Sequence, residues 1–108
     1  MYYLYILYSP SSDKYYVGQT NDIEARITDH NAGNRPEQTR KYTFKHRPWR
    51  LELSIPIQGD RKSVMEIERF IKNKKSRVFL ERLIQAKGDD QRLAQLLRVP
   101  IEIIGINQ

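Results

Sequence analysis

Residues 2–8 form an unbroken run of aromatic and aliphatic side chains, Tyr-Tyr-Leu-Tyr-Ile-Leu-Tyr, which limits the folds open to this chain. A strand that is apolar at every position is buried on both faces, so other elements have to cover it from two sides. Residues 9–14 are polar and contain Pro10, which indicates a turn. Residues 15–20 then predict the returning strand of a hairpin. Gly18 within that strand indicates a bulge or a close approach of another group to its backbone.

The remaining elements follow in a simple order. A helix is expected after a cap at Asn21 or Asp22, with Ile23 and Ile27 as its apolar stripe. A long basic loop, a third strand and further helices follow, and a proline in the third strand indicates a sheet edge. The expected ranges are 34–48 for the loop, 49–57 for the strand, 63–75 for a helix capped by Ser63, and 76–87 and 89–97 for two more helices. The order β-β-α-β-α-α predicts a single α+β domain over residues 1–108, in which helices flank a small, largely antiparallel three-stranded sheet.

Composition excludes several classes of site. The chain has no cysteine and two histidines, which rules out disulfides, thiolate zinc sites and cysteine nucleophiles and argues against a histidine-rich metal cage. A hard cation held by carboxylate is compatible with this composition. No apolar run approaches the length that spans a membrane, and the first residues lack the basic flank of a signal peptide. We therefore expect no membrane association and a cytoplasmic location.

The net charge of +6 is concentrated in two windows. Residues 33–50 contain six Arg or Lys against one acid, and residues 69–77 contain five against none. Concentrated cations favour nucleic acid as a partner, because each neutralised phosphate releases condensed counterions. A solvated basic surface is the competing interpretation. The residues expected to bind nucleic acid are Arg35, Arg40, Lys41, Lys45, Arg47, Lys72, Lys74 and Lys75.

Arg26 and His30 lie one turn apart in the first expected helix. At about 100° per residue, both fall within about 60° of Ile23, so they border the buried stripe. Arg26 could pair with Asp22 one turn earlier, and His30 could be a partly buried polar residue. Two adjacent donors beside a tyrosine-rich hairpin favour an anion site instead.

Tyr5 and Tyr16 lie on the two strands of the expected hairpin. In one register they share a face of the sheet, and in the next they lie on opposite faces. Strand alternation leaves this choice open, and packing is a sufficient explanation for either tyrosine taken singly.

Glu68 is the carboxylate expected beside the core of a later helix. The apolar stripe of that helix consists of Val64, Ile67 and Ile71. Glu68 lies about 70° from the centre of the stripe, whereas Glu66 lies about 130° away and is expected to face solvent. Glu68 could pair with Lys72 four residues later, a contact worth only about 0.3–0.5 kcal/mol. It could instead hold one Mg²⁺, with water and phosphate completing the coordination.

Taken together, these residues resemble the signature of the GIY-YIG nuclease family, in particular its small single-domain members. Leu4-Tyr5 corresponds to the end of the first motif, although Tyr3 stands where the family has glycine, and Tyr16-Val17-Gly18 corresponds to the second motif. The other segments that resemble the family are 22–33, Lys41-Tyr42-Thr43, Arg47-Pro48-Trp49 and 68–72. The resemblance covers residues 2–77 as a catalytic core and leaves 78–108 as a helical C-terminal extension without an assigned role.

The resemblance implies a metal-dependent endonuclease that hydrolyses phosphodiester bonds in DNA, with RNA not excluded. It implies that Glu68 binds one Mg²⁺ or Mn²⁺ and that Arg26 stabilises the charge that develops on phosphate. It further implies that Tyr5 helps to deprotonate the attacking water and that Tyr16 donates a hydrogen bond to phosphate. His30 would orient a tyrosine or share the proton transfer.

Two other classes of function compete with the nuclease. In the nuclease, the basic windows would grip the nucleic-acid backbone, with Tyr42 and Trp49 available for stacking. A nucleic-acid-binding module without cleavage activity, or one whose partner supplies the chemistry, keeps the basic windows but does not need Glu68 or both tyrosines. An interaction domain that uses the helices after residue 76 needs none of the site residues. The sequence does not decide between branched and linear substrates, and it does not decide the oligomeric state. It also leaves open the biological role, which ranges from repair and recombination to defence or mobility.

Overall fold

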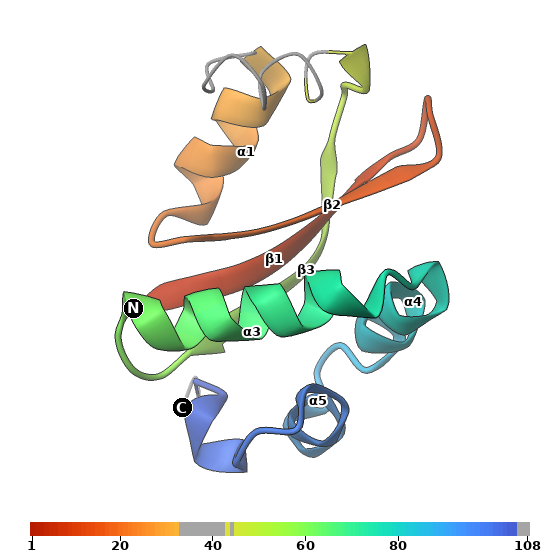
Figure 1. Ribbon diagram of the computed structural model, residues 1–108. Coiled ribbons are helices and arrows are strands. Elements are labelled where there is room, and N and C mark those ends of the chain that lie inside the picture. The colour runs from red at the N-terminus through yellow and green to blue at the C-terminus, as the bar shows by residue number, and fades with distance from the viewer. Residues whose placement is uncertain (33–42, 44, 106–108) are drawn as a thin grey trace.

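The computed structural model describes residues 1–32, 43 and 45–105. Its centre is a three-stranded antiparallel sheet made of β1 (Tyr2–Ser9), β2 (Lys14–Thr20) and β3 (Arg50–Ile57), in the order β2-β1-β3. The central strand is the apolar run at the N-terminus, as its two-sided burial requires. The predicted α+β fold, with a small antiparallel sheet flanked by helices, is confirmed (Figure 1).

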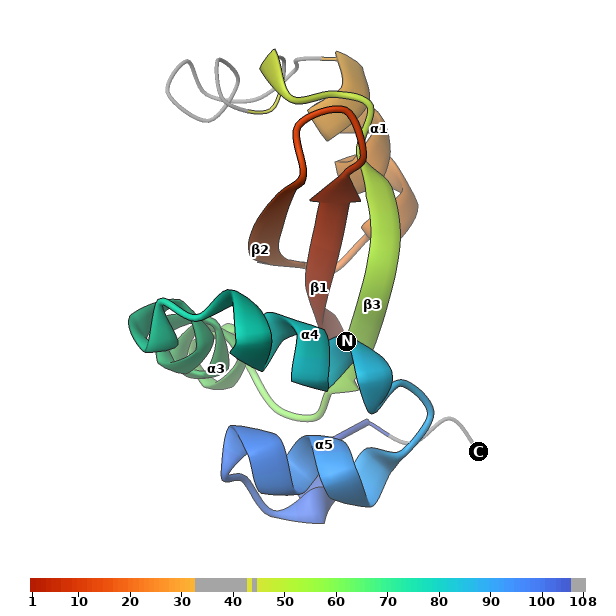
Figure 2. The ribbon, with the colours of Figure 1, turned by 90° about the vertical axis from the view of Figure 1, so that its right-hand side faces the viewer.

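Helices cover both faces of the sheet. The helix α1 (Ile23–Ala32) lies on one side, and the others lie on the opposite side, as Figures 1 and 2 both show. These others are α3 (Arg61–Lys74), α4 (Arg77–Gln85), α5 (Asp90–Leu97) and the short 3-10 helix η1 (Ile101–Ile103). No helix in the described ranges is long and apolar enough to cross a membrane.

The central strand divides its side chains between two cores. Leu4 and Ile6 belong to the larger core, which packs against α3, α4 and α5. Tyr5 and Leu7 belong to a smaller core together with Trp49, and α1 covers it. All four strand residues are at most 1% exposed, which explains why β1 carries no polar face.

Side-chain caps set the beginnings of the helices. Asp22 accepts a hydrogen bond from the Ala25 backbone at 3.1 Å, as predicted for the start of α1. The cap of α3 is Asp60, so the prediction of Ser63 was wrong. The Ser63 backbone N–H and hydroxyl both donate to the Asp60 carboxylate, at 3.0 and 3.1 Å, which places Ser63 inside the first turn. A carboxylate at the cap satisfies the orphan N–H groups and also suits the helix dipole.

The C-terminal segment packs on the sheet. Ile104 forms an antiparallel bridge with Ile57, and the Gly105 backbone N–H donates to the Pro56 carbonyl. This contact lies along the outer edge of β3, the edge position that the proline had indicated. Residues beyond position 77 also supply buried members of the larger core, among them Leu83, Leu93 and Leu97.

Candidate active site

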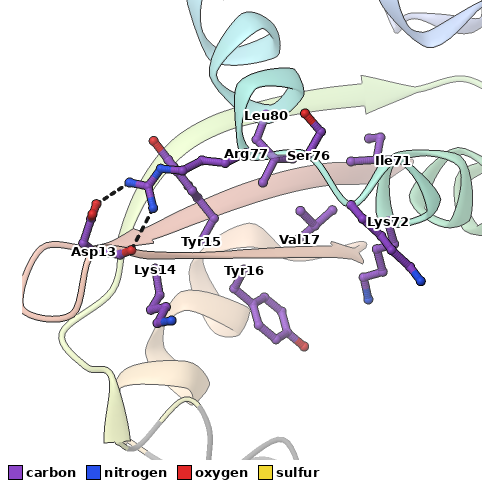
Figure 3. A pocket seen from close by; sticks show the side chains of 11 residues that line it. Asp13, Lys14, Tyr15, Tyr16, Val17, Ile71, Lys72, Ser76, Arg77 and Leu80 are labelled. Carbon is purple, nitrogen blue, oxygen red and sulfur yellow. Dashed lines mark hydrogen bonds and ion pairs between the residues drawn. The ribbon is translucent and has the colours of Figure 1, made fainter.

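The register of the hairpin brings Tyr5 and Tyr16 together. Tyr5 pairs with Gly18, and Leu7 pairs with Tyr16, so both tyrosines lie on the face of the sheet that α1 covers. Their rings stack, with centroids 6.4 Å apart and planes 24° apart. In Figure 3 the Tyr16 side chain points away from α4, whereas its neighbour Val17 points toward α3 and α4. The register that alternation left open is thereby decided in favour of one shared face.

The close approach indicated at Gly18 is made by the Tyr5 ring. A Cβ atom built on Gly18 would lie 2.5 Å from the Tyr5 hydroxyl oxygen and 2.7 Å from its Cζ atom. No side chain fits at that distance, so glycine at this position lets the phenol lie flat across β2. The glycine of the second motif thus sets the position of the tyrosine of the first.

His30 is the polar centre of this cluster. Its ring is fully buried, its Nε2 atom lies 3.0 Å from the Tyr5 hydroxyl, and its centroid lies 4.5 Å from that of Tyr16. Burial lowers the pKa of His30 from 6.5 to about 4, against a smaller opposing effect of nearby Asp29. At neutral pH the imidazole is therefore uncharged. Its Nδ1 atom has no hydrogen-bond partner among the described residues.

Arg26 is anchored at one end of its guanidinium. Its Nε atom lies 3.4 Å from the Thr20 hydroxyl oxygen, at the end of β2. The alternative pairing with Asp22 does not occur, because that carboxylate caps α1 instead. Within the described residues Arg26 has no carboxylate partner, so its terminal NH₂ groups stay available to an anion.

Glu68 lies on α3, on the opposite side of the sheet from α1. The buried residues of α3 are Val64, Ile67 and Ile71, the predicted stripe. Glu68 is half-buried and Glu66 is exposed, as expected. The Glu68 carboxylate lies 2.6 Å from the Lys72 ammonium group, so the i to i+4 pair is formed. Its side chain is 20% exposed.

Three of the five candidate residues form one cluster. Tyr5, Tyr16 and His30 are in direct contact, and Arg26 lies at the far end of β2. Glu68 is linked to them indirectly. Its partner Lys72 and Tyr16 line the same pocket, which lies beside the outer edge of β2 (Figure 3).

The basic windows are described in part. Lys72, Lys74 and Lys75 are exposed at the end of α3, and Lys45 is exposed before β3. The Arg47 guanidinium donates to the Asn31 carbonyl at 3.3 Å. The candidates that lie outside the described residues are Arg35, Arg40, Lys41 and Tyr42.

The expectation that Trp49 offers a stacking surface was wrong. Trp49 is 3% exposed, and its indole N–H donates to the Thr43 carbonyl at 2.8 Å. Asn31, which sequence reasoning did not single out, holds its backbone. The Asn31 amide accepts from the Trp49 N–H at 2.6 Å and donates to the Trp49 carbonyl at 3.2 Å. Eighteen positions separate the two residues, so no local pattern reveals this contact.

Whether this site can bind a divalent cation depends on Glu68. In the described parts of the chain, no three histidine, aspartate or glutamate side chains gather into a metal site. Mg²⁺ keeps several waters and often binds one or two carboxylates plus substrate phosphate, so a lone carboxylate is an adequate protein donor. The chemistry of Glu68 thus fits a divalent cation that is held jointly by protein and substrate, once Lys72 releases the carboxylate.

Comparison with family models gives one match: the GIY-YIG catalytic domain, over residues 1–82. The matched range includes all three strands, α1 and α3, and therefore every candidate catalytic residue. Comparisons with curated proteins and with solved structures give no match.

Proposed function

Because this chain belongs to the GIY-YIG nuclease family, we propose that it is a metal-dependent endonuclease that hydrolyses phosphodiester bonds in DNA. The observation that carries the proposal is the buried hydrogen bond between the Tyr5 hydroxyl and His30, stacked against Tyr16 on the matched scaffold. A buried polar cluster of this kind costs desolvation, so a purely structural core has little use for it.

The pKa of His30 assigns it an orienting role. A phenol ordinarily has a pKa near 10, and His30 has a pKa of about 4. Because burial lowers the pKa of His30, the imidazole is a weak base, and in this proposal it is not the final acceptor of the phenolic proton. As a neutral ring, it fixes the direction of the Tyr5 hydroxyl. The attacking water then has to reach Tyr5 within an enclosed site, since Tyr5 is 1% exposed.

Arg26 and Tyr16 provide the phosphate contacts in this proposal. The Thr20 hydroxyl accepts from the Arg26 Nε atom, which leaves the two terminal nitrogens for a bidentate contact with phosphate oxygens. Tyr16 is half-buried on the same face of the sheet as Tyr5, and in this proposal its hydroxyl donates to the same phosphate.

Glu68 would hold the divalent cation. When bound, Mg²⁺ or Mn²⁺ supplies charge neutralisation at the scissile phosphate and the leaving oxygen. Lys72 holds the Glu68 carboxylate in the absence of substrate, and a phosphate that attracts the Lys72 ammonium group frees that carboxylate. Substrate and metal are therefore expected to bind cooperatively.

The test is cleavage of labelled linear, flapped and branched DNAs, with RNA controls, in Mg²⁺ or chelator. We expect product in Mg²⁺ that Glu68→Ala and Arg26→Ala both abolish. Glu66→Ala is the matched control, because Glu66 is an exposed glutamate two positions away on the same helix. Loss of activity in Glu66→Ala, or cleavage that survives Glu68→Ala, refutes the assignment of the site.

A non-catalytic nucleic-acid-binding module is the second candidate. The observation in its favour is the Glu68–Lys72 ion pair, which occupies the only proposed metal ligand. Under this alternative none of the substrates is cut, and salt-sensitive binding persists unchanged in the Glu68→Ala and Arg26→Ala proteins.

A further inference from the structure

A pocket of about 680 Å³ lies beside the outer edge of β2, where α3 ends and α4 begins. Its floor is apolar, formed by Val17, Ile71 and Leu80. Figure 3 shows Val17 on β2 below Leu80 of α4 and Ile71 of α3. The volume is within the range of small-molecule sites and is large enough for one nucleotide.

The rim of the pocket is cationic. Lys14, Lys72, Lys75 and Arg77 line it, together with one carboxylate, Asp13. Arg77 is bound to Asp13, and Lys72 is bound to Glu68. Lys14 and Lys75 are exposed and make no ion pair within the described part of the chain, so two cations are free to take an anion.

Both ends of this pocket are fixed. The Arg77 guanidinium also donates to the Asp13 carbonyl at 3.0 Å and lies 5.0 Å from the centre of the Tyr15 ring, which ties the hairpin to α4. At the other end, α3 stops at Lys75 in a left-handed conformation, and Ser76 caps α4 through the Phe79 N–H at 3.0 Å. The pocket therefore lies between a hairpin that is bound to α4 and a helix junction with a side-chain cap.

A cationic rim over an apolar floor suits a ligand with an anionic group and a flat apolar body. A nucleotide has both, but within a duplex its base is stacked and paired and cannot enter. An unpaired nucleotide places its base on the floor and its phosphate at Lys14 and Lys75. Tyr16 lines this pocket, and its ring, which points to the opposite face of β2, contacts Tyr5 and His30, so a nucleotide bound here lies across β2 from the proposed catalytic cluster.

We infer that this pocket binds an unpaired nucleotide of the DNA strand that is cut, which directs the protein to sites where duplex and single strand meet. The inference rests on the proposed function, since it places the pocket across β2 from the proposed catalytic cluster. It adds a binding site, made by β2, α3 and α4, that the catalytic residues do not require.

The experiment measures binding by fluorescence anisotropy, in chelator, of DNA hairpins with a short single-stranded overhang or a blunt end. The pocket variant combines Lys14→Glu with Lys75→Glu. The control combines Lys62→Glu with Lys87→Glu, which makes the same change of charge at exposed lysines outside the pocket. A third variant, Leu80→Trp, fills the floor without a change of charge, and circular dichroism confirms that each variant is folded.

We expect the wild type to prefer the overhang. The pocket variant should lose at least about tenfold more affinity for the overhang than the control does, with equal losses on the blunt hairpin. Leu80→Trp should lose at least about tenfold in affinity for the overhang relative to the wild type and bind the blunt hairpin as the wild type does. Equal binding of both hairpins by the wild type, or equal losses in pocket and control variants, overturns the inference. So does tighter binding of an RNA overhang than of its DNA counterpart.

The binding assay and the cleavage assay fail independently. Overhang preference that depends on the pocket, in a protein that cuts no substrate, supports the pocket and refutes the proposed nuclease. Cleavage that needs Glu68 but is equally fast in the pocket and control variants supports the nuclease and refutes the pocket.

Discussion

Acidification should destabilise this protein through one buried side chain, His30. The imidazole is 0% exposed, lies between Tyr5 and Tyr16, and has a pKa lowered by burial to about 4. In the unfolded chain the same group has its ordinary pKa of 6.5. Between these two values the unfolded state binds more protons than the folded state, so the free energy of unfolding falls as the pH falls.

The size of the effect follows from the two pKa values. Above about pH 6.5 the His30 imidazole is neutral in both the folded and the unfolded state, so it does not lower the free energy of unfolding. That free energy falls as the pH falls to about 4, and below that pH the imidazole is protonated in both states and the effect stops growing. The loss over that window is about 3 kcal/mol. For a small domain this is a large share of the total stability.

The assay is urea unfolding of wild type and His30→Gln at several pH values between 7 and 4. The variant lacks the titrating group, so the difference between the two curves isolates His30. Asp13 and Asp60, whose carboxyl pKa values are lowered by hydrogen bonds to Tyr8 and Ser63, titrate in both proteins and cancel. Parallel curves for wild type and variant would falsify the assignment of a buried neutral imidazole.

Three further changes test the packing of the site. Tyr5→Phe removes the hydrogen bond to the buried His30 ring and should cost about 1–3 kcal/mol of unfolding free energy. The control Tyr8→Phe removes an exposed hydroxyl and should cost less than about 1 kcal/mol. Equal costs for the two variants in chemical denaturation contradict this prediction. Gly18→Ala should lower stability by about 1–3 kcal/mol, because its Cβ overlaps the Tyr5 hydroxyl, and an unchanged melting temperature argues against that contact. Asn31→Ala removes two hydrogen bonds to the Trp49 backbone and should cost about 1–3 kcal/mol of unfolding free energy, with faster hydrogen exchange at the Trp49 amide. Unchanged exchange at that amide contradicts this role of Asn31.

Much of the fold is visible in local patterns. The apolar run at 2–8 identifies a strand buried on two faces, and β1 lies at the centre of the sheet. Periodicity identifies Val64, Ile67 and Ile71 as the buried stripe of α3 and separates Glu68 from Glu66. These features depend on residues within one or two turns of each other, where backbone geometry alone relates position to direction.

The site is different because its contacts are distant in the chain. The hairpin register places Tyr5 across Gly18, and Asn31 holds the backbone of Trp49. Trp49 illustrates the difference, since aromatic character gave no indication of whether the ring would face solvent or the core. Side-chain burial depends on which elements pack together, a long-range choice that local propensity does not contain.

Residue types and spacing thus decided the elements, their order and the chemical groups available to a phosphodiesterase. Tertiary structure alone decided which of those groups touch. It set Tyr5 against His30, bound the Asn31 amide to the Trp49 backbone, and formed the pocket between β2 and the junction of α3 with α4. The physical reason is that a contact between distant residues is selected by the joint packing of the whole core, in which each buried side chain has one space that fits it.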